Sequence, residues 1–160
     1  IHQGNKSRPF NFQAVPISEI YLEQGPWGRV DTAFRKMSET GRNVTQLWPD
    51  ATFPDSLAKQ FKDKPDEKHA FVEACLAGEY TFRELDDKGK LTTVKRYGYK
   101  YVVVHATTKT LVVDRAPQRS SPWVIFRWST LTGEIYGRGP VLKALPDVKS
   151  INKTKELLLK

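Results

Sequence analysis

The stretch of sequence that organises this chain is Ser121-Pro122-Trp123-Val124-Ile125-Phe126-Arg127-Trp128, followed by Gly133-Glu134-Ile135-Tyr136-Gly137-Arg138-Gly139-Pro140. Proline cannot donate to a sheet ladder and belongs at the first residue of a strand, and the residues from Trp123 to Trp128 are β-branched or aromatic apart from Arg127. We therefore predict an aromatic strand. Gly137 and Gly139 predict a corner after it, and Pro140 suits a first helical position.

The residues after the corner predict a helix, because apolar side chains recur at helical spacing: Val141, Ala144, Leu145, Val148, Ile151 and Leu158. A proline inside a helix costs ~3 kcal/mol, so we predict a turn from Pro140 and a main helix that begins at Pro146, with Asp147 in its first turn. The apolar run before Lys160 has no stop signal, which favours a longer helix that this sequence truncates.

The residues before the organising stretch predict short strands and two short helices. Strands are expected at Ile17 to Leu22, Arg29 to Met37, His69 to Ala77, Tyr80 to Leu85, Leu91 to Val94, Tyr97 to Val104 and Leu111 to Asp114, with a short helix as the alternative for the segment from His69. Turns are expected at 24–28, 86–89 and 107–109, and helices from Ser38 or Thr40 to Trp48 and from Pro54 to Phe61. The predicted fold class is α+β with an antiparallel sheet. We divide it into a β-rich domain, residues 1–136, and a glycine-rich elbow with the start of a helix, residues 137–160.

Composition limits the chemistry of the chain. The 160 residues carry a formal charge of +8 and one cysteine, Cys75, which we expect to be a buried thiol. The Gly-Arg-Gly corner fits neither a dinucleotide nor a P-loop pattern, and no metal-ligand spacing is present. No apolar run is long enough for a membrane helix. We therefore expect no cofactor, no metal and no membrane.

An enzyme is not expected. The three histidines are His2, His69 and His105, so a nucleophile and base pair requires Cys75 or a serine beside His69 or His105. Neighbouring carboxylates such as Asp86 and Asp87 fall at turns, where they are common without catalysis.

A second hypothesis is a free-standing basic nucleic-acid-binding module. Lys95, Arg96 and Lys100 lie beside three tyrosines, Tyr97, Tyr99 and Tyr101, which suits phosphate contact and base stacking. The same pattern also fits a strand that buries the tyrosine rings and leaves Lys100 in water. Salt dependence of DNA binding separates the two interpretations.

Two ordered blocks closely resemble the portal, or head-to-tail connector, proteins of short-tailed bacteriophages. The C-terminal block comprises Pro122 to Trp128, Gly133 to Pro140, Ala144 to Lys149 and Ile151-Asn152; the upstream block comprises Ala14 to Ile17, Gly28 to Thr32 and Phe34 to Lys36. Between residues 62 and 118 the resemblance is only that of a β-rich region.

The resemblance implies a structural subunit of a ring, most often dodecameric, at one vertex of the capsid. Double-stranded DNA is packaged through such a ring by a separate terminase motor and is later ejected, and the portal itself does not hydrolyse ATP. It implies residence in the virion, with assembly in the host cytoplasm, and partners among capsid, terminase and tail adaptor proteins. The β-rich part corresponds to the wing, and the helix after Pro140 begins the stem.

The candidate site residues follow from the same region. A strand-to-helix elbow fixes an angle that every subunit of a ring must repeat, and Arg127 or Arg138 can fix it by pairing with Glu134 or Asp147, within one chain or between neighbours. The elbow and subunit-interface candidates are Trp123, Phe126, Arg127, Trp128, Tyr136, Gly137, Arg138, Gly139, Pro140, Pro146 and Asp147. These side chains can equally complete the core and corner of a single domain.

Overall fold

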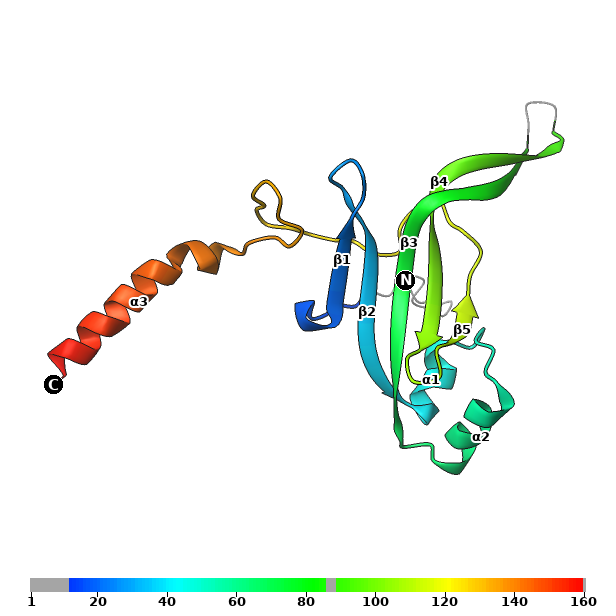
Figure 1. The fold of residues 1–160 in the computed structure, drawn as a ribbon, viewed down its shortest axis with the longest axis horizontal. Helices are drawn as coiled ribbons and strands as arrows, with labels where there is room; N and C mark the ends of the chain where they lie inside the picture. The colour runs from blue at the N-terminus through cyan, green and yellow to red at the C-terminus, as the bar shows by residue number, and fades with distance from the viewer. Residues whose placement is uncertain (1–11, 86–88, 160) are drawn as a thin grey trace. The chain divides into compact units, whose positions relative to one another are not determined.

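The computed structural model describes residues 12–85 and 89–159 (Figure 1). The chain forms two compact units that divide between Val124 and Ile125. The first unit holds an antiparallel sheet and two short helices, and the second holds a loop and one long helix. The predicted α+β class is confirmed. The predicted boundary of wing and stem between residues 136 and 137 stays a prediction.

The sheet is a meander of five strands in chain order: β1 (Ile20–Gln24), β2 (Val30–Thr40), β3 (Lys68–Leu85), β4 (Leu91–His105) and β5 (Thr110–Asp114) (Figure 1). All neighbouring strands are antiparallel. A 3-10 turn, η1 (Ile17–Glu19), precedes β1, so the first strand begins three residues later than Ile17. The other sheet strands form close to where their residues predict them, but two of them are longer: β3 joins the strands predicted at 69–77 and 80–85, and β4 joins those predicted at 91–94 and 97–104.

The predicted turns set the register of the meander. Gly28 has a φ of 73° and its N–H donates to the carbonyl of Gly25 at 3.1 Å, which closes the β1–β2 hairpin. Lys109, with a φ of 53°, closes the turn before β5. The predicted turn at 86–89 lies largely outside the described residues, but Leu85 and Leu91 on either side pair as expected.

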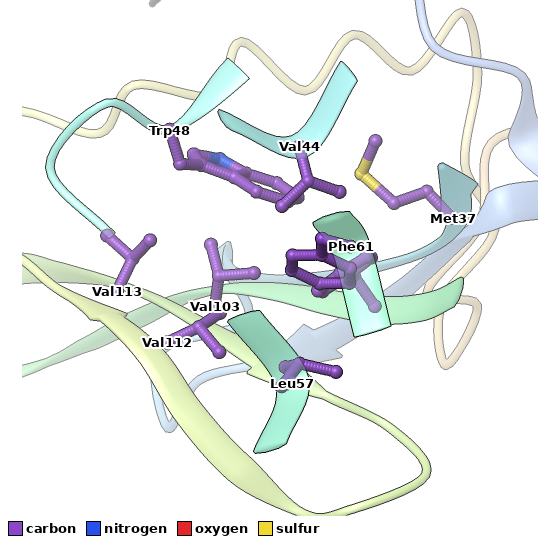
Figure 2. Packing of buried hydrophobic residues seen from close by; sticks show 9 residues of the cluster. Met37, Val44, Trp48, Leu57, Phe61, Val103, Val112 and Val113 are labelled. Carbon is purple, nitrogen blue, oxygen red and sulfur yellow. The ribbon is translucent and has the colours of Figure 1, made fainter. Parts of the chain in front are cut away.

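Two helices, α1 (Gly41–Leu47) and α2 (Asp55–Asp63), confirm the two predicted short helices. Pro54 is the N-cap of α2, one position before the first helical residue. Their apolar side chains converge on valines of β4 and β5 (Figure 2). The core consists of Met37, Val44, Trp48, Leu57, Phe61, Phe71, Val103, Val112 and Val113. The predicted burial of Cys75 is also confirmed.

The predicted strand from Trp123 to Trp128 is wrong. This segment forms no ladder with another strand, and the nearest pairing is a single bridge between Ser129 and Arg138. Val124, Phe126 and Trp128 are 88%, 78% and 65% exposed. β-propensity describes how well a side chain packs on a half-buried sheet, and no sheet covers this segment among the described residues.

The C-terminal helix, α3 (Pro140–Leu158), begins where the corner predicts, with Gly139 as N-cap and Pro140 in its first turn. The predicted start at Pro146 is wrong, because α3 continues through Pro146 and leaves Asp147 in the helix interior. Proline keeps a helical φ, so the helix loses one hydrogen bond there and retains the rest of its ladder. None of the helices in residues 12–85 and 89–159 combines the length and apolar character needed to cross a bilayer.

Candidate functional site

The elbow loop, residues 125–139, is a hairpin-like turn that leads into α3. The Arg138 N–H donates to the Ser129 carbonyl at 2.7 Å, and the Ser129 hydroxyl donates to the Arg138 carbonyl at 3.3 Å. Gly133, with a φ of 87°, takes the left-handed conformation at the tip. The two ends of the loop are therefore tied together immediately before the helix.

Arg138 and Glu134 form one of the predicted elbow ion pairs. The Arg138 Nε donates to both Glu134 carboxylate oxygens, at 2.9 and 3.1 Å. Hydrogen bonding from Arg138 lowers the pKa of Glu134 below its usual value. Arg127 instead donates to the Ile135 carbonyl at 3.3 Å. Within the described part of the chain, Asp147 pairs with neither arginine.

Gly137 permits a close approach within the loop. A Cβ added to Gly137 meets the Cβ of Arg127 at 2.9 Å and its Cα at 3.0 Å, so any larger residue has to displace the backbone. Gly139 is different, because a Cβ there meets nothing within 4 Å. The first glycine is thus required by packing and the second serves as the helix N-cap.

Three aromatic members of the candidate site, Phe126, Trp128 and Tyr136, are exposed, whereas Trp123 is half-buried. Phe126 and Trp128 contact each other edge to face, with ring centroids 6.2 Å apart, and Tyr136 is 39% exposed. No residue of α3 is buried. We define the open apolar side chains of the second unit as Phe126, Trp128, Leu131, Val141, Leu142, Leu145, Val148, Ile151, Leu157, Leu158 and Leu159.

The three basic nucleic-acid candidates do not form a surface of uncompensated charge. The Arg96 Nε lies 2.9 Å from Glu84 Oε1, and the Lys100 Nζ lies 2.8 Å from Asp114 Oδ1. Arg119 also pairs with Glu84. Lys95 is exposed on β4. Two of the three positive charges therefore already have carboxylate partners.

The neighbouring tyrosines make polar contacts within the protein. The Tyr97 hydroxyl donates to Asp31 Oδ2, which raises the pKa of Tyr97 to about 12. Tyr101 is largely buried and bonds through its hydroxyl, and Tyr97 contacts Tyr99 edge to face with centroids 6.0 Å apart. This geometry favours the structural interpretation of the tyrosines.

Sequence reasoning missed a buried polar chain across the sheet. Trp48 Nε1 donates to the Tyr101 hydroxyl at 3.0 Å, and that hydroxyl donates to Glu73 Oε1 at 2.7 Å. Arg35 lies 3.5 Å from Glu73 Oε2 and 2.9 Å from Glu19 Oε2. The sequence did contain a signal for this chain: Glu73 is a carboxylate among the apolar residues of β3. A buried charge requires partners, so its position predicts polar side chains around it.

The candidates for catalysis show no catalytic arrangement. Cys75 is fully buried, and burial raises the pKa of its thiol, which keeps it protonated and unreactive. Its sulfur lies 3.7 Å from the Ser121 hydroxyl. In residues 12–85 and 89–159 there is no group of three or more His, Cys, Asp or Glu side chains that could hold a metal ion.

Comparison with known proteins defines the class of this chain. The family model described as bacteriophage head to tail connecting protein matches residues 1–160, the whole sequence. The chain therefore belongs to this family of phage structural proteins. As a connector it is a component of the phage particle, with the head and tail parts as its partners. A search of curated proteins found no match.

Proposed function

We propose that this chain is a subunit of a ring-shaped portal at a capsid vertex, through whose channel double-stranded DNA enters during packaging and leaves during ejection. Membership of the connector family supports a role where the phage head joins the tail. The observation that carries the proposal of assembly is α3, a helix of 19 residues with none of them buried.

Five apolar residues of α3 share one side of the helix. Val141, Leu145, Val148 and Ile151 recur at three- and four-residue spacing and Leu158 follows seven residues later, whereas Leu142 and Leu157 lie away from this stripe. Val141 is 72% exposed, Ile151 66% and Leu158 81%. Apolar stripes of this extent in soluble proteins are normally covered by another surface. Neighbouring subunits of a ring supply that cover.

A closed ring requires every subunit to repeat one geometry, because a head-to-tail contact closes only at a fixed rotation. The Arg138–Glu134 pair and the Gly137–Arg127 contact restrict the entry of the chain into α3. We propose that residues 1–136 form the wing and residues 137–160 the start of the stem, in a ring that is dodecameric. Capsid, terminase and tail adaptor proteins are then the partners of the ring.

Native mass spectrometry and electron microscopy of the chain test the assembly. We expect one cyclic stoichiometry and rings with a central channel. The double variant Val148→Asp/Ile151→Asp places charge in the stripe and is expected to weaken association by about 2 kcal/mol or more, roughly 30-fold in the dissociation constant. Circular dichroism should show an unchanged sheet.

Ser150→Asp is the matched control, because Ser150 lies on the opposite side of α3 and its hydroxyl donates to the Pro146 carbonyl at 3.0 Å. It should assemble as the parent chain does. A chain that stays monomeric at every concentration contradicts the ring, as does an assembly that both variants weaken equally.

DNA binding over a salt series separates the ring from the basic module. A ring subunit should show only weak attraction to short duplexes, without sequence preference. A monomer whose affinity is high at low salt and falls steeply as salt rises contradicts the portal proposal.

A further inference from the structure

Two of the three histidines lie together in the interior of the first unit. His69 on β3 and His105 at the end of β4 have ring centroids 5.6 Å apart, and they are 9% and 2% exposed. Phe71, two residues after His69 on β3, pairs in register with His105, which brings the two imidazoles to the same region of the sheet. Neither ring takes part in the connector role proposed above.

Aromatic rings enclose the pair. Phe61 of α2 contacts His69 edge to face at 4.8 Å, and Phe71 contacts His105 at 5.2 Å. Phe61 belongs to the core that holds α2 on the sheet. The imidazoles therefore form part of the contact between the helices and the sheet.

The polar atoms of the pair are incompletely satisfied. The His105 Nδ1 lies 2.7 Å from the Thr108 hydroxyl, but the Nε2 atoms of His69 and His105 are both buried without a hydrogen-bond partner. A buried polar atom without a partner costs free energy, and a charge there costs more. The buried His105 ring is therefore best accommodated in its neutral form.

No packed element brings a compensating charge to either ring. On β2, Glu39 pairs in register with His69, but its carboxylate accepts from Asn43 Nδ2 at 3.2 Å. Arg42 of α1 pairs with Asp66, and Lys64 with Glu67, in exposed positions. The charged residues of α2 are also exposed: Asp55, Lys59, Lys62 and Asp63. On β5, the register partner of His105 is the uncharged Thr110. Within the described part of the chain, no carboxylate pairs with either imidazole.

We propose that the His69–His105 pair is a proton-operated release for the helical layer: protonation of His105 places an unpaired charge between Phe71 and His69, the ring on which Phe61 packs, and loosens α2 from the sheet. The device is reversible, because it involves only proton binding.

The environment of His105 in the folded chain determines how stability changes with pH. Burial, and to a smaller extent the neighbouring His69, lower the pKa of His105. The unfolded chain thus binds this proton more readily than the folded chain. Stability is full at neutral pH and falls as the pH drops below about 6.5, the ordinary histidine value, until the folded-state pKa is passed.

The test uses the full chain with His2→Gln, so that only the two buried histidines give imidazole signals. We expect NMR titration to place the His105 imidazole below the ordinary value near 6.5. The opening equilibrium constant of α2, obtained as the amide exchange rate divided by the intrinsic rate at each pH, should rise as the pH falls below about 6.5, by up to about tenfold per pH unit. The opening constant of the β1–β2 hairpin should change much less.

His105→Phe removes the ring whose protonation is proposed to act and keeps an aromatic side chain beside Phe71. It is expected to abolish the pH dependence of the α2 opening constant, whereas His69→Phe, which keeps an aromatic side chain beside Phe61, should retain most of it. If a phenylalanine variant fails to fold, the titration of His105 in the His2→Gln protein still tests the proposal. An ordinary titration of His105 together with an α2 opening constant that does not change with pH overturns the proposal.

Discussion

The two units of the chain differ in how deeply they bury their large apolar side chains, as two tryptophans show. Trp48 is 1% exposed, packs on Phe71 with centroids 5.2 Å apart and donates to Tyr101. Trp128 is 65% exposed and packs edge to face on the similarly open Phe126. The sheet unit buries Trp48 and Phe71 in its core, although Trp27 at its β1–β2 turn stays open, whereas the aromatic residues of the second unit are all exposed.

The difference has a structural cause. A stable core needs two packed layers, and in the first unit α1 and α2 supply a layer over the sheet. The second unit has one helix and one loop, and no residue of α3 is buried. Its conformation therefore depends on local backbone features such as the Gly139 cap and the Arg138–Glu134 pair. Its open side chains require cover from elsewhere, which the ring proposal supplies.

The largest expected effect comes from the tryptophan pair. Trp48→Ala should destabilise the first unit by about 3–5 kcal/mol, because it leaves a cavity and removes the Tyr101 contact. Trp128→Ala should change monomer stability by less than about 0.5 kcal/mol. Urea denaturation followed by circular dichroism measures both. Equal losses for the two variants would show that Trp128 is covered within the chain.

Pro146→Ala tests whether the missing N–H donor of Pro146 limits the stability of α3. The substitution restores an N–H donor in an exposed helix interior and should stabilise the helix locally by ~3 kcal/mol, seen as higher helicity and slower amide exchange in 140–158. Ala144→Gly, a change in the opposite direction, should cost about 1 kcal/mol. If neither variant alters exchange, packing rather than propensity fixes α3, and the contrast between the units fails.

Gly137→Ala probes the elbow loop with a smaller effect. The added methyl meets Arg127 at 2.9 Å and should cost about 1–3 kcal/mol locally, so the Arg138 amide, which bonds to Ser129, should exchange faster. Gly139→Ala has open space and should lose only an N-cap preference of up to about 1 kcal/mol, confined to the start of α3. If the Arg138 amide exchanges at the same rate in both variants, the loop accommodates the added methyl at residue 137 without cost.

Most of the first unit could be predicted from the sequence because its signals are local. The glycine turn before Val30, the alternation after His69 and the helical spacing around Leu57 and Phe61 each predict the element that forms. The polar chain through Glu73 could not be predicted, since it joins residues of three strands, of η1 and of the segment after α1, which only the fold brings together.

The second unit shows where local signals fail. The residues from Trp123 to Trp128 have strand character, but a strand requires a partner and none is present in the described part of the chain. The cost of a proline inside a helix, considered alone, predicts that the helix starts at Pro146. The helix instead begins at Pro140 and continues through Pro146. The elbow pair of Arg138 and Glu134, in contrast, needs only four residues of separation and forms as predicted.

The meander also has a consequence for folding kinetics. Every strand pairs with its neighbour along the chain, and only the β2–β3 connection, residues 41–67 with α1 and α2, is long; such local pairing favours rapid folding. Because β1 to β5 precede α3 in the sequence, they emerge first from the ribosome. The sheet can thus be complete before the open apolar helix is exposed, which shortens the time during which the nascent chain is prone to aggregate.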